Sequence, residues 1–543
     1  IDAVAKNQST SQYGTIVAMS ESPVNPDLLA IGTDDGLIHI SEDGGTSWRK
    51  IDGIAGAPAR SYVNSVYLSK HDENLIYAAF NHHKYGDFKP YLFKSSDKGR
   101  TWTSISSDLP SKGSVYSIEE DHIDKDLIFC GTEYGVFFSP NRGQHWKELS
   151  AGLPTIAVRD IAIQERENDL VLGTFGRGFY VLDDYSALRS VKNKEPDAEA
   201  TIYPVRDALS WEISMPLGLP KKAFQGDNFY SATNLGPEAL ITYYYDENYK
   251  SLKEIRTKKE KELIKKGGNA PYPSYDALKA EMDENEPSLV FTIKDQNGQI
   301  VKKEFKKPKK GIQRFHWNLR YTLQNPISLK KSSFYNPFSS SDEGTLVEPG
   351  TYTVQMELFE NGELRKLTDP VSFKVVGLDN TVMPAEDRAE KVAFQRQVMQ
   401  LNADLQACRK IMDESDNKLK YIKSAIKRSE LPYGELSKEV LEIENKLKEA
   451  RVSLYGDPVK RRLDISQVQN PASRIGKINY QQKYSTSAPT KTHRDSYSIA
   501  KEQITDIKQK VEKIYNADIK ELEKKLIESG APYTPGRGYE NEN

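Results

Sequence analysis

The spacing of hydrophobic and polar residues changes twice along the chain and divides it into three predicted regions. Short apolar runs separated by turn residues fill residues 1–190, and longer alternating runs follow over residues 198–380. From residue 384 to 530, apolar residues recur every three to four positions, which is the period of amphipathic helices. The pattern predicts a mainly β protein with an α-helical tail, followed by a polar end at residues 531–543.

The first region repeats one strand pattern four times. An apolar run, which ends in Gly-Thr in three of the four repeats, is followed by a short turn and a second apolar run, as in Leu28–Thr33 and Leu37–Ser41. The same Gly-Thr pair recurs at Gly131 and Thr132 and at Gly173 and Thr174. Four-stranded antiparallel units of this length are typical of β-propeller blades. We therefore predict four blades within residues 1–190.

A motif of the form Ser-x-Asp-x-Gly-x-Ser/Thr-Trp ends the strand pairs of the first three repeats. In the third copy, Asn replaces Asp and His replaces the hydroxyl residue. Asp and Ser can hydrogen-bond to turn amides, Gly allows a positive φ, and Trp can pack between blades. We predict this structural role rather than a catalytic or metal-binding one. The motif residues are Ser41, Asp43, Gly45, Trp48, Ser95, Asp97, Gly99, Trp102, Ser139, Asn141, Gly143 and Trp146.

Residues 198–380 have the strand count and turn spacing of an immunoglobulin-like sandwich. Asn297 and Gly298 form a favoured two-residue hairpin turn between two of the strands. A Lys- and Glu-rich insertion at residues 250–286 has helical character, and it is either a solvated excursion or a partner-docking element. Trp317 is expected in the core rather than as a sugar-stacking platform. The expected strands are Ala232–Tyr245, Leu289–Ile293, Gln299–Phe305, Phe315–Tyr321, Thr351–Leu358 and Val371–Val376.

The tail is predicted to form an antiparallel bundle of three helices. These helices cover Pro384–Ser429, Tyr433–Val452 and Ser496–Ser529, and a polar stretch with scattered prolines separates the last two. The two cysteines, Cys130 and Cys408, lie in different predicted domains, so we expect them to be packing residues rather than a disulfide.

Charge and hydropathy narrow the classes of partner. Lys and Arg total 76 and Asp and Glu total 78, so the net charge of -2 provides no long-range attraction for nucleic acid or an anionic membrane. No apolar run is long enough to be a predicted membrane span. The sequence does not begin with Met, which suggests a processed or trimmed beginning from which a signal segment can have been lost. The remaining blades are expected either upstream of Ile1 or on another chain, and we favour the first.

The repeated motif resembles the Asp box, or BNR repeat, of sialidases, xyloglucanase-type glycosidases and sortilin-type receptors. Residues 173–184 resemble the segment that closes the propeller in a large bacterial family labelled sortilin-like or glycosyl-hydrolase-like, although members often have His where this chain has Phe175. Residues 317–321 and 349–353 resemble the sandwich of the same family. The resemblance covers nearly the whole chain, and it implies an exported protein in the periplasm, the cell envelope or the medium.

No residue is nominated as catalytic, and no metal or cofactor is predicted. The arginines are spread over the repeats, so they do not indicate the arginine cluster of a sialidase. An inverting glycosidase needs two facing carboxylates. The candidates near strand ends each have an ordinary turn or capping explanation. They are Asp34, Asp35, Glu133, Asp183 and Asp184.

A long loop in the second repeat is the best candidate for partner contact. It contains the only adjacent histidines together with protruding aromatic residues, and a zinc site is conceivable there but less favoured than a solvated loop. We expect a non-catalytic propeller that binds a protein, peptide or glycan. The alternatives are a glycosidase with part of its site upstream and a structural subunit of a cell-envelope complex. The candidate contact residues are His82, His83, Tyr85, Asp87, Phe88 and Arg177.

Overall fold

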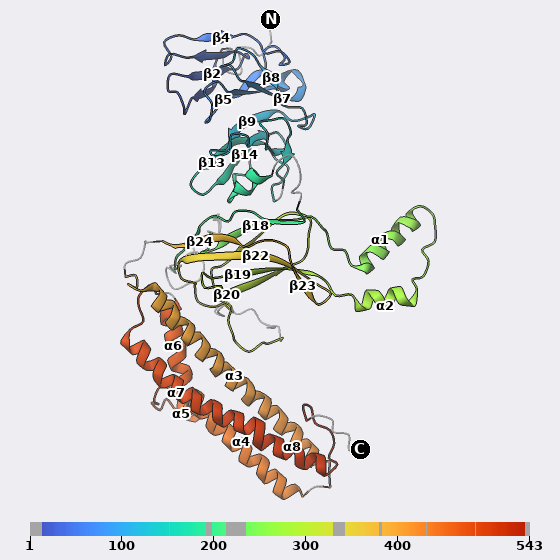
Figure 1. The fold of residues 1–543 in the computed structure, drawn as a ribbon, viewed down its shortest axis with the longest axis vertical. Helices are drawn as coiled ribbons and strands as arrows, with labels where there is room; N and C mark the ends of the chain where they lie inside the picture. Colours follow the sequence, from blue (N-terminus) through green and yellow to red (C-terminus); the bar gives the residue numbers. More distant parts are fainter. Residues whose placement is uncertain are drawn as a thin grey trace. The chain divides into compact units, whose positions relative to one another are not determined.

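The structure is a computed structural model that describes residues 14–150, 152–191, 198–212, 235–329, 343–378, 383–430, 432–483 and 485–537. The chain forms two compact units. Unit 1 contains the residues up to Pro204 with two later segments, Thr242–Asn248 and Lys309–Gln313, and unit 2 contains the rest. The protein is mainly β with a helical C-terminal part, as the sequence predicts (Figure 1).

Unit 1 contains four successive antiparallel sheets whose strands follow one another in chain order. The first three sheets have four strands each, and the fourth has three. This is the connectivity of propeller blades. The strands are β1 (Ile16–Glu21), β2 (Leu29–Thr33), β3 (Ile38–Ser41), β4 (Arg49–Ile51), β5 (Tyr62–Leu68), β6 (Ile76–His82), β7 (Asp87–Ser95), β8 (Thr103–Ser104), β9 (Val115–Glu120), β10 (Ile128–Thr132), β11 (Gly135–Ser139), β12 (Lys147–Glu148), β13 (Val158–Gln164), β14 (Asp169–Thr174) and β15 (Phe179–Leu182).

Apolar layers join each sheet of unit 1 to the next. Ile38 and Ile40 of the first sheet pack with Val63 and Phe80 of the second in one buried cluster. Similar clusters join the second sheet to the third and the third to the fourth. Cys130 lies fully buried in one of them and is a free thiol. Because alternate residues of a strand face opposite sides, inner sheets can bury both faces in this way.

The residues of the repeated Ser-x-Asp-x-Gly-x-Ser/Thr-Trp motif, which we call the box, form hydrogen bonds within the turn between the third and fourth strands of each sheet that carries it. The Ser41 hydroxyl accepts a hydrogen bond from the Gly45 amide at 2.8 Å, and the Asp43 carboxylate accepts one from the Ser47 amide at 2.8 Å. The second copy repeats both bonds, and Asn141 of the third copy accepts from the His145 amide. Hydrogen bonds from the Ser47 side chain and amide lower the pKa of Asp43.

Glycines of the boxes also allow close contact between neighbouring sheets. Gly99 has φ of +78°, and a Cβ atom there would lie 2.5 Å from the Ile40 side chain of the preceding sheet. Gly143 lies against Ile105 in the same way. The third tryptophan differs from the first two, because the Trp146 indole donates to the Ile105 carbonyl at 2.7 Å instead of to its own turn.

Unit 2 contains most of the second predicted region. Its largest sheet has the strand order β17-β24-β22-β19-β20, with β23 paired to β22, and β17 runs parallel to β24. Another sheet, whose strand β16 belongs to unit 1, has the order β16-β18-β21. The immunoglobulin-like assignment stays a prediction. The strands are β16 (Ala200–Ile202), β17 (Ala208–Ser210), β18 (Ala239–Tyr245), β19 (Ser288–Lys294), β20 (Ile300–Lys306), β21 (Gly311–Trp317), β22 (Gly350–Glu360), β23 (Glu363–Lys366) and β24 (Val371–Gly377).

Several details of this region differ from the expectation. The strand expected over Phe315–Tyr321 lies earlier, because Leu319 adopts a positive φ of 53° that ends regular extension. Residues 232–234 of another expected strand lie outside the described residues. The insertion forms two helices, α1 (Leu252–Lys265) and α2 (Tyr275–Asp283), which glycines and prolines separate. Trp317 is buried against Tyr352.

The tail forms six described helices, and all of them except α5 contribute residues to one apolar core that includes Cys408. Three helices were predicted, and the polar stretch between the second and the third contains two more, α5 and α6. Helix α6 buries only two aliphatic side chains, Ile475 and Ile478, beside Pro471 and Gln482, so its periodic signal is short. A π-helical turn at Ile514–Asp518 interrupts the last predicted helix. The helices are α3 (Arg388–Ile426), α4 (Tyr433–Tyr455), α5 (Pro458–Arg462), α6 (Pro471–Lys483), α7 (Lys491–Lys513) and α8 (Ile519–Glu528).

Candidate functional site

Most of the candidate contact residues lie at one edge of the sheets in unit 1, by which we mean the edge formed by the ends of the strands. In each sheet the first strand begins beside the end of the second strand, as the pairs Tyr62 with Asn81 and Val158 with Thr174 show. The turns after these second strands therefore lie at this edge, which we call the rim. We define the rim by Asp34, Tyr62, His82, His83, Tyr85, Tyr116, Glu133, Arg159, Phe175 and Arg177.

An arginine held between two aromatic rings is the most ordered feature of the rim. The Arg159 guanidinium lies 3.7 Å from the centroid of the Tyr116 ring and 5.1 Å from that of the Phe175 ring. Tyr116 donates its hydroxyl proton to the Glu133 carboxylate. Burial raises the pKa of Tyr116 to about 12, and the bond to Glu133 adds to the rise. Residues from two strands and two turns thus fix one cation in place.

The loop of the second sheet supplies the remaining part of the rim. The rings of His82 and Tyr85 stack with centroids 4.4 Å apart, and His82 Nδ1 lies 3.1 Å from the Ser61 hydroxyl. Burial lowers the pKa of His83, and the charge of Arg159 acts in the same direction. Tyr85 is exposed. The loop is therefore internally ordered while its aromatic surface faces solvent.

Two of the six candidate contact residues, Asp87 and Phe88, form hydrogen bonds with residues outside the rim. The Asp87 carboxylate accepts a hydrogen bond from the Tyr91 hydroxyl at 2.6 Å, which lowers the pKa of Asp87. The Phe88 carbonyl accepts from the Gly113 amide of the next sheet at 2.7 Å, although the Phe88 ring is exposed. Arg177 is exposed in the turn that also carries Phe175.

Sequence reasoning missed Tyr116 and Arg159 as site residues. Arg159 is the second residue of β13 and Tyr116 the second residue of β9, so both occupy the same position in their sheets. Their equivalent positions could have indicated from the sequence that the two residues lie close together, because corresponding positions of repeated units lie at the same edge. Reading the arginines as evenly spread surface charges concealed it.

Two carboxylates near the other strand ends accept hydrogen bonds from backbone amides. Asp34 accepts from the amides of Gly14 and Thr15 at 2.8 and 3.0 Å. Asp184 accepts from the amide of Ser186 at the start of a short 3₁₀ helix. Within the described ranges, no cluster of three or more His, Cys, Asp or Glu side chains is arranged to hold a metal ion.

The opposite edge of the same sheets contains a buried acidic network. Asp121 is inaccessible to solvent and accepts two hydrogen bonds from Arg189, each at 2.8 Å, and another from the Tyr185 hydroxyl. Burial alone would raise the pKa of Asp121, but the bonds from Arg189 and Tyr185 outweigh it and lower the pKa. Lys70 pairs with Glu119 at 2.8 Å nearby. This network is too enclosed to meet a ligand.

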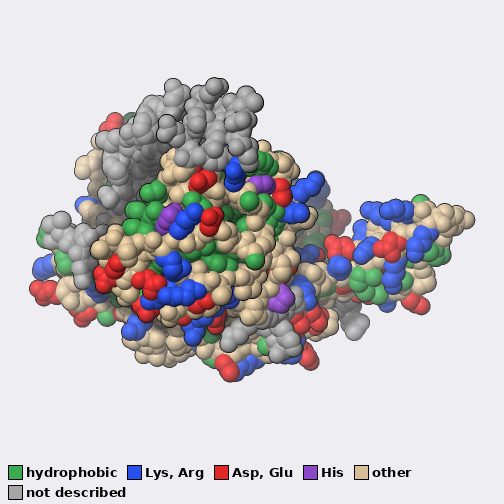
Figure 2. Space-filling model, turned by 90° about the horizontal axis from the view of Figure 1, so that it is seen from above, with side chains coloured by type: hydrophobic (Ala, Val, Ile, Leu, Met, Phe, Trp, Pro, Cys, Tyr) green, Lys and Arg blue, Asp and Glu red, His purple; other side chains and the backbone are tan. Residues whose placement is uncertain are grey.

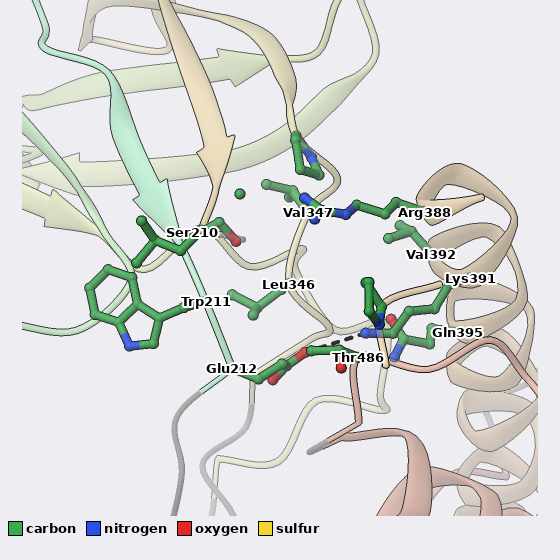
Figure 3. Close-up of a pocket in the computed structure, with 14 residues that line it drawn as sticks. Ser210, Trp211, Glu212, Leu346, Val347, Arg388, Lys391, Val392, Gln395 and Thr486 are labelled. Carbon is green, nitrogen blue, oxygen red and sulfur yellow. Dashed lines mark hydrogen bonds and ion pairs between the residues drawn. The ribbon is translucent and has the colours of Figure 1, made fainter. Parts of the chain in front are cut away.

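A small pocket in unit 2 lies between the end of β17 and helix α3 (Figure 3). Glu212 and Lys391 face each other there at 3.5 Å. Burial raises the pKa of Glu212 and lowers that of Lys391. The cavity of 80 Å³ is well below the roughly 300–1,000 Å³ of ordinary ligand pockets. We therefore regard the ion pair as a structural link between strand and helix.

Comparisons with known proteins leave the family open. No protein-family profile and no curated protein matches the chain. Matching solved structures include YCF48 bound to D1 peptide (16% identity, 32% of this chain and 52% of that chain, TM-score 0.26) and YCF48 from Cyanidioschyzon merolae (15%, 31% and 52%, TM-score 0.23). An ancestral GH74 enzyme matches at 14% identity over 64% of this chain and 39% of that chain (TM-score 0.26). The chain spans about half the length of the YCF48 structures, and similarities at these TM-scores carry no conclusion about function.

None of the helices in the described ranges combines the length and apolar character that crossing a bilayer requires.

Proposed function

We propose that unit 1 is a ligand-binding part of an exported Asp-box β-propeller of the sortilin-like type, and that its rim binds an acidic peptide segment of a partner protein. One observation carries this proposal. Arg159 is exposed and held by Tyr116 and Phe175, yet among the described residues no carboxylate forms an ion pair with it. A pre-positioned guanidinium is suited to bind a carboxylate through two hydrogen bonds.

The surroundings of Arg159 support a peptide ligand. Phe175 is 69% exposed, and Tyr134 and Tyr85 add further exposed aromatic surface. Arg177 supplies a second exposed cation on the same turn as Phe175. Exposed aromatic rings beside arginines are the side chains that dominate binding energy at protein interfaces. Figure 2 shows basic, acidic and hydrophobic side chains intermixed on the face of the molecule that it presents.

The two end sheets of unit 1 support its assignment to a larger propeller. Met19 pairs with Ile31 on the face of the first sheet that points away from the second, and Met19 is exposed. Phe179 and Val181 of the fourth sheet are exposed on the face away from its buried cluster. Apolar sheet faces are stabilised by packing against another layer. We propose that further sheets of the same kind cover them.

A peptide array with acidic, neutral and basic sequences, probed with the full chain beside a glycan array, tests the proposed ligand class. We expect binding to acidic peptides, and we expect Arg159→Gln to weaken it at least about tenfold, as for loss of a charge-assisted bond. Arg166→Gln is the matched control, because Arg166 is exposed in the turn at the opposite edge, where it pairs only with Glu167. Equal binding by Arg159→Gln, or turnover of aryl glycosides by the full chain, would overturn the proposal.

A further inference from the structure

The insertion of unit 2 forms an arm without a core of its own. Helices α1 and α2 and the residues that connect them, 252–283, extend from the sheet as a hairpin, which we call the arm (Figure 1). Neither helix contains a buried residue. Helices of globular proteins usually obtain most of their stability from burial of an apolar face. The arm must therefore be held in shape by other contacts.

Polar contacts hold the two helices together near the base of the arm. Arg256 binds Glu281 through two hydrogen bonds, at 2.5 and 3.0 Å, and it binds Glu260 at 2.7 Å. Glu284 accepts a hydrogen bond from the Leu252 amide. Ser251 caps the first helix, in a capping box. Because these contacts are polar, the apolar side chains of the arm are left free for another use.

The tip of the arm combines exposed apolar residues with positive charge. Leu263, Ile264, Tyr272 and Tyr275 are between 44 and 89% exposed. No Asp or Glu occurs between Glu262 and Asp276, whereas Lys265 and Lys266 lie in that segment and are exposed. Figure 2 shows basic side chains beside hydrophobic ones on the arm. The chain as a whole has balanced charge, so this carboxylate-free tip is a local exception.

We propose that the tip of the arm docks on the surface of an anionic lipid bilayer. Tyrosine favours the boundary between water and hydrocarbon, and lysine can extend its ammonium group toward headgroups while its alkyl stem stays in apolar surroundings. Anionic headgroups attract basic residues and would repel carboxylates. Four apolar side chains at the end of a narrow hairpin suit shallow insertion better than the broad, flat contact of a protein interface. This docking is independent of the rim.

Flotation of the full chain with lipid vesicles tests the proposal. The probes are vesicles of phosphatidylcholine alone and vesicles in which phosphatidylglycerol replaces part of it. We expect the chain to float with the anionic vesicles and to remain behind with the neutral ones. Raising the salt concentration to about 1 M should weaken the binding, since the Debye length falls to about 3 Å.

Two variants of the tip and two matched controls make the result specific. Lys265→Glu/Lys266→Glu and Ile264→Asp should each reduce binding to anionic vesicles at least about tenfold. The controls make the same changes at exposed positions of the tail, namely Lys410→Glu/Lys420→Glu and Leu441→Asp, and they should bind as the unmodified chain does. Circular dichroism should confirm that all four variants fold.

The proposal is overturned if the unmodified chain does not float with anionic vesicles, which would indicate a protein partner for the tip. It is also overturned if the tip variants float as well as their controls. Neither outcome bears on acidic-peptide binding at the rim, because the rim variant Arg159→Gln leaves the arm unchanged.

Discussion

The two edges of the sheets in unit 1 contain charged residues in opposite situations. In the buried acidic network, the partly exposed Arg189 forms an ion pair with Asp121, which is inaccessible to solvent. At the rim, Arg159 is stacked on Tyr116 and exposed, with no ion pair to a described carboxylate. The same repeated sheets thus use arginine to hold the sheets together at one edge and to present a cation at the other. The difference predicts that substitutions at the first edge affect folding and those at the second affect binding.

The largest expected effect is at the buried edge. Asp121→Ala should lower the free energy of unfolding by about 3–5 kcal/mol, because it removes the buried carboxylate that accepts hydrogen bonds from the Arg189 guanidinium and the Tyr185 hydroxyl. Asp126→Ala is the matched control in the same turn, since Asp126 forms only a surface pair with Arg142 and should cost about 0–1 kcal/mol. Urea unfolding followed by fluorescence measures both. Equal losses in the two variants would contradict the contrast between the edges.

The contacts between boxed sheets should show the next largest effect. Gly99→Ala places a Cβ atom 2.5 Å from Ile40 at a positive φ. We expect a loss of about 3 kcal/mol, of which about 1 comes from the left-handed backbone and about 2 from overpacking. Gly178→Ala isolates the backbone contribution, because Gly178 has φ of +71° and no atom within 4 Å of its added Cβ. If Gly99→Ala is as stable as Gly178→Ala, close packing of Gly99 against Ile40 does not contribute to stability.

Acid should weaken unit 1 through carboxylates whose pKa is lowered in the folded state. Hydrogen bonds lower the pKa of Asp43 and of Asp97, and bonds from Arg189 and Tyr185 lower that of Asp121. Such groups contribute stability above the unfolded value of about 3.9, and this stability is lost as the pH falls through the folded pKa. The urea concentration at the midpoint of unfolding should therefore decrease as the pH is lowered from 5 to 3. The decrease should be smaller in Asp97→Asn.

The repeats could be predicted from the sequence because the residues that define each turn are close together in the chain. The Ser, Asp and Gly of each box act on amides within four residues, so the motif alone indicates the turn. Helix α6 could not be recognised in this way, because Ile475 and Ile478 are the only aliphatic residues among the four that it buries. The stack of Arg159 on Tyr116 joins two different sheets, and such a contact appears only once the sheets are placed side by side.

The smallest expected effect on folding is at Phe175, where the comparison of the two edges is sharpest. The Phe175 ring is mostly exposed, so Phe175→Ala should change the free energy of unfolding by less than about 0.5 kcal/mol. Tyr116 still holds the Arg159 guanidinium at 3.7 Å, so the cation keeps one of its two rings. Loss of the other ring removes about 0.5–1 kcal/mol of cation–π attraction, and acidic-peptide affinity should fall about two- to fivefold. If Phe175→Ala unfolds more readily and still binds acidic peptides normally, Phe175 contributes to packing and its ring does not help Arg159 to bind the ligand.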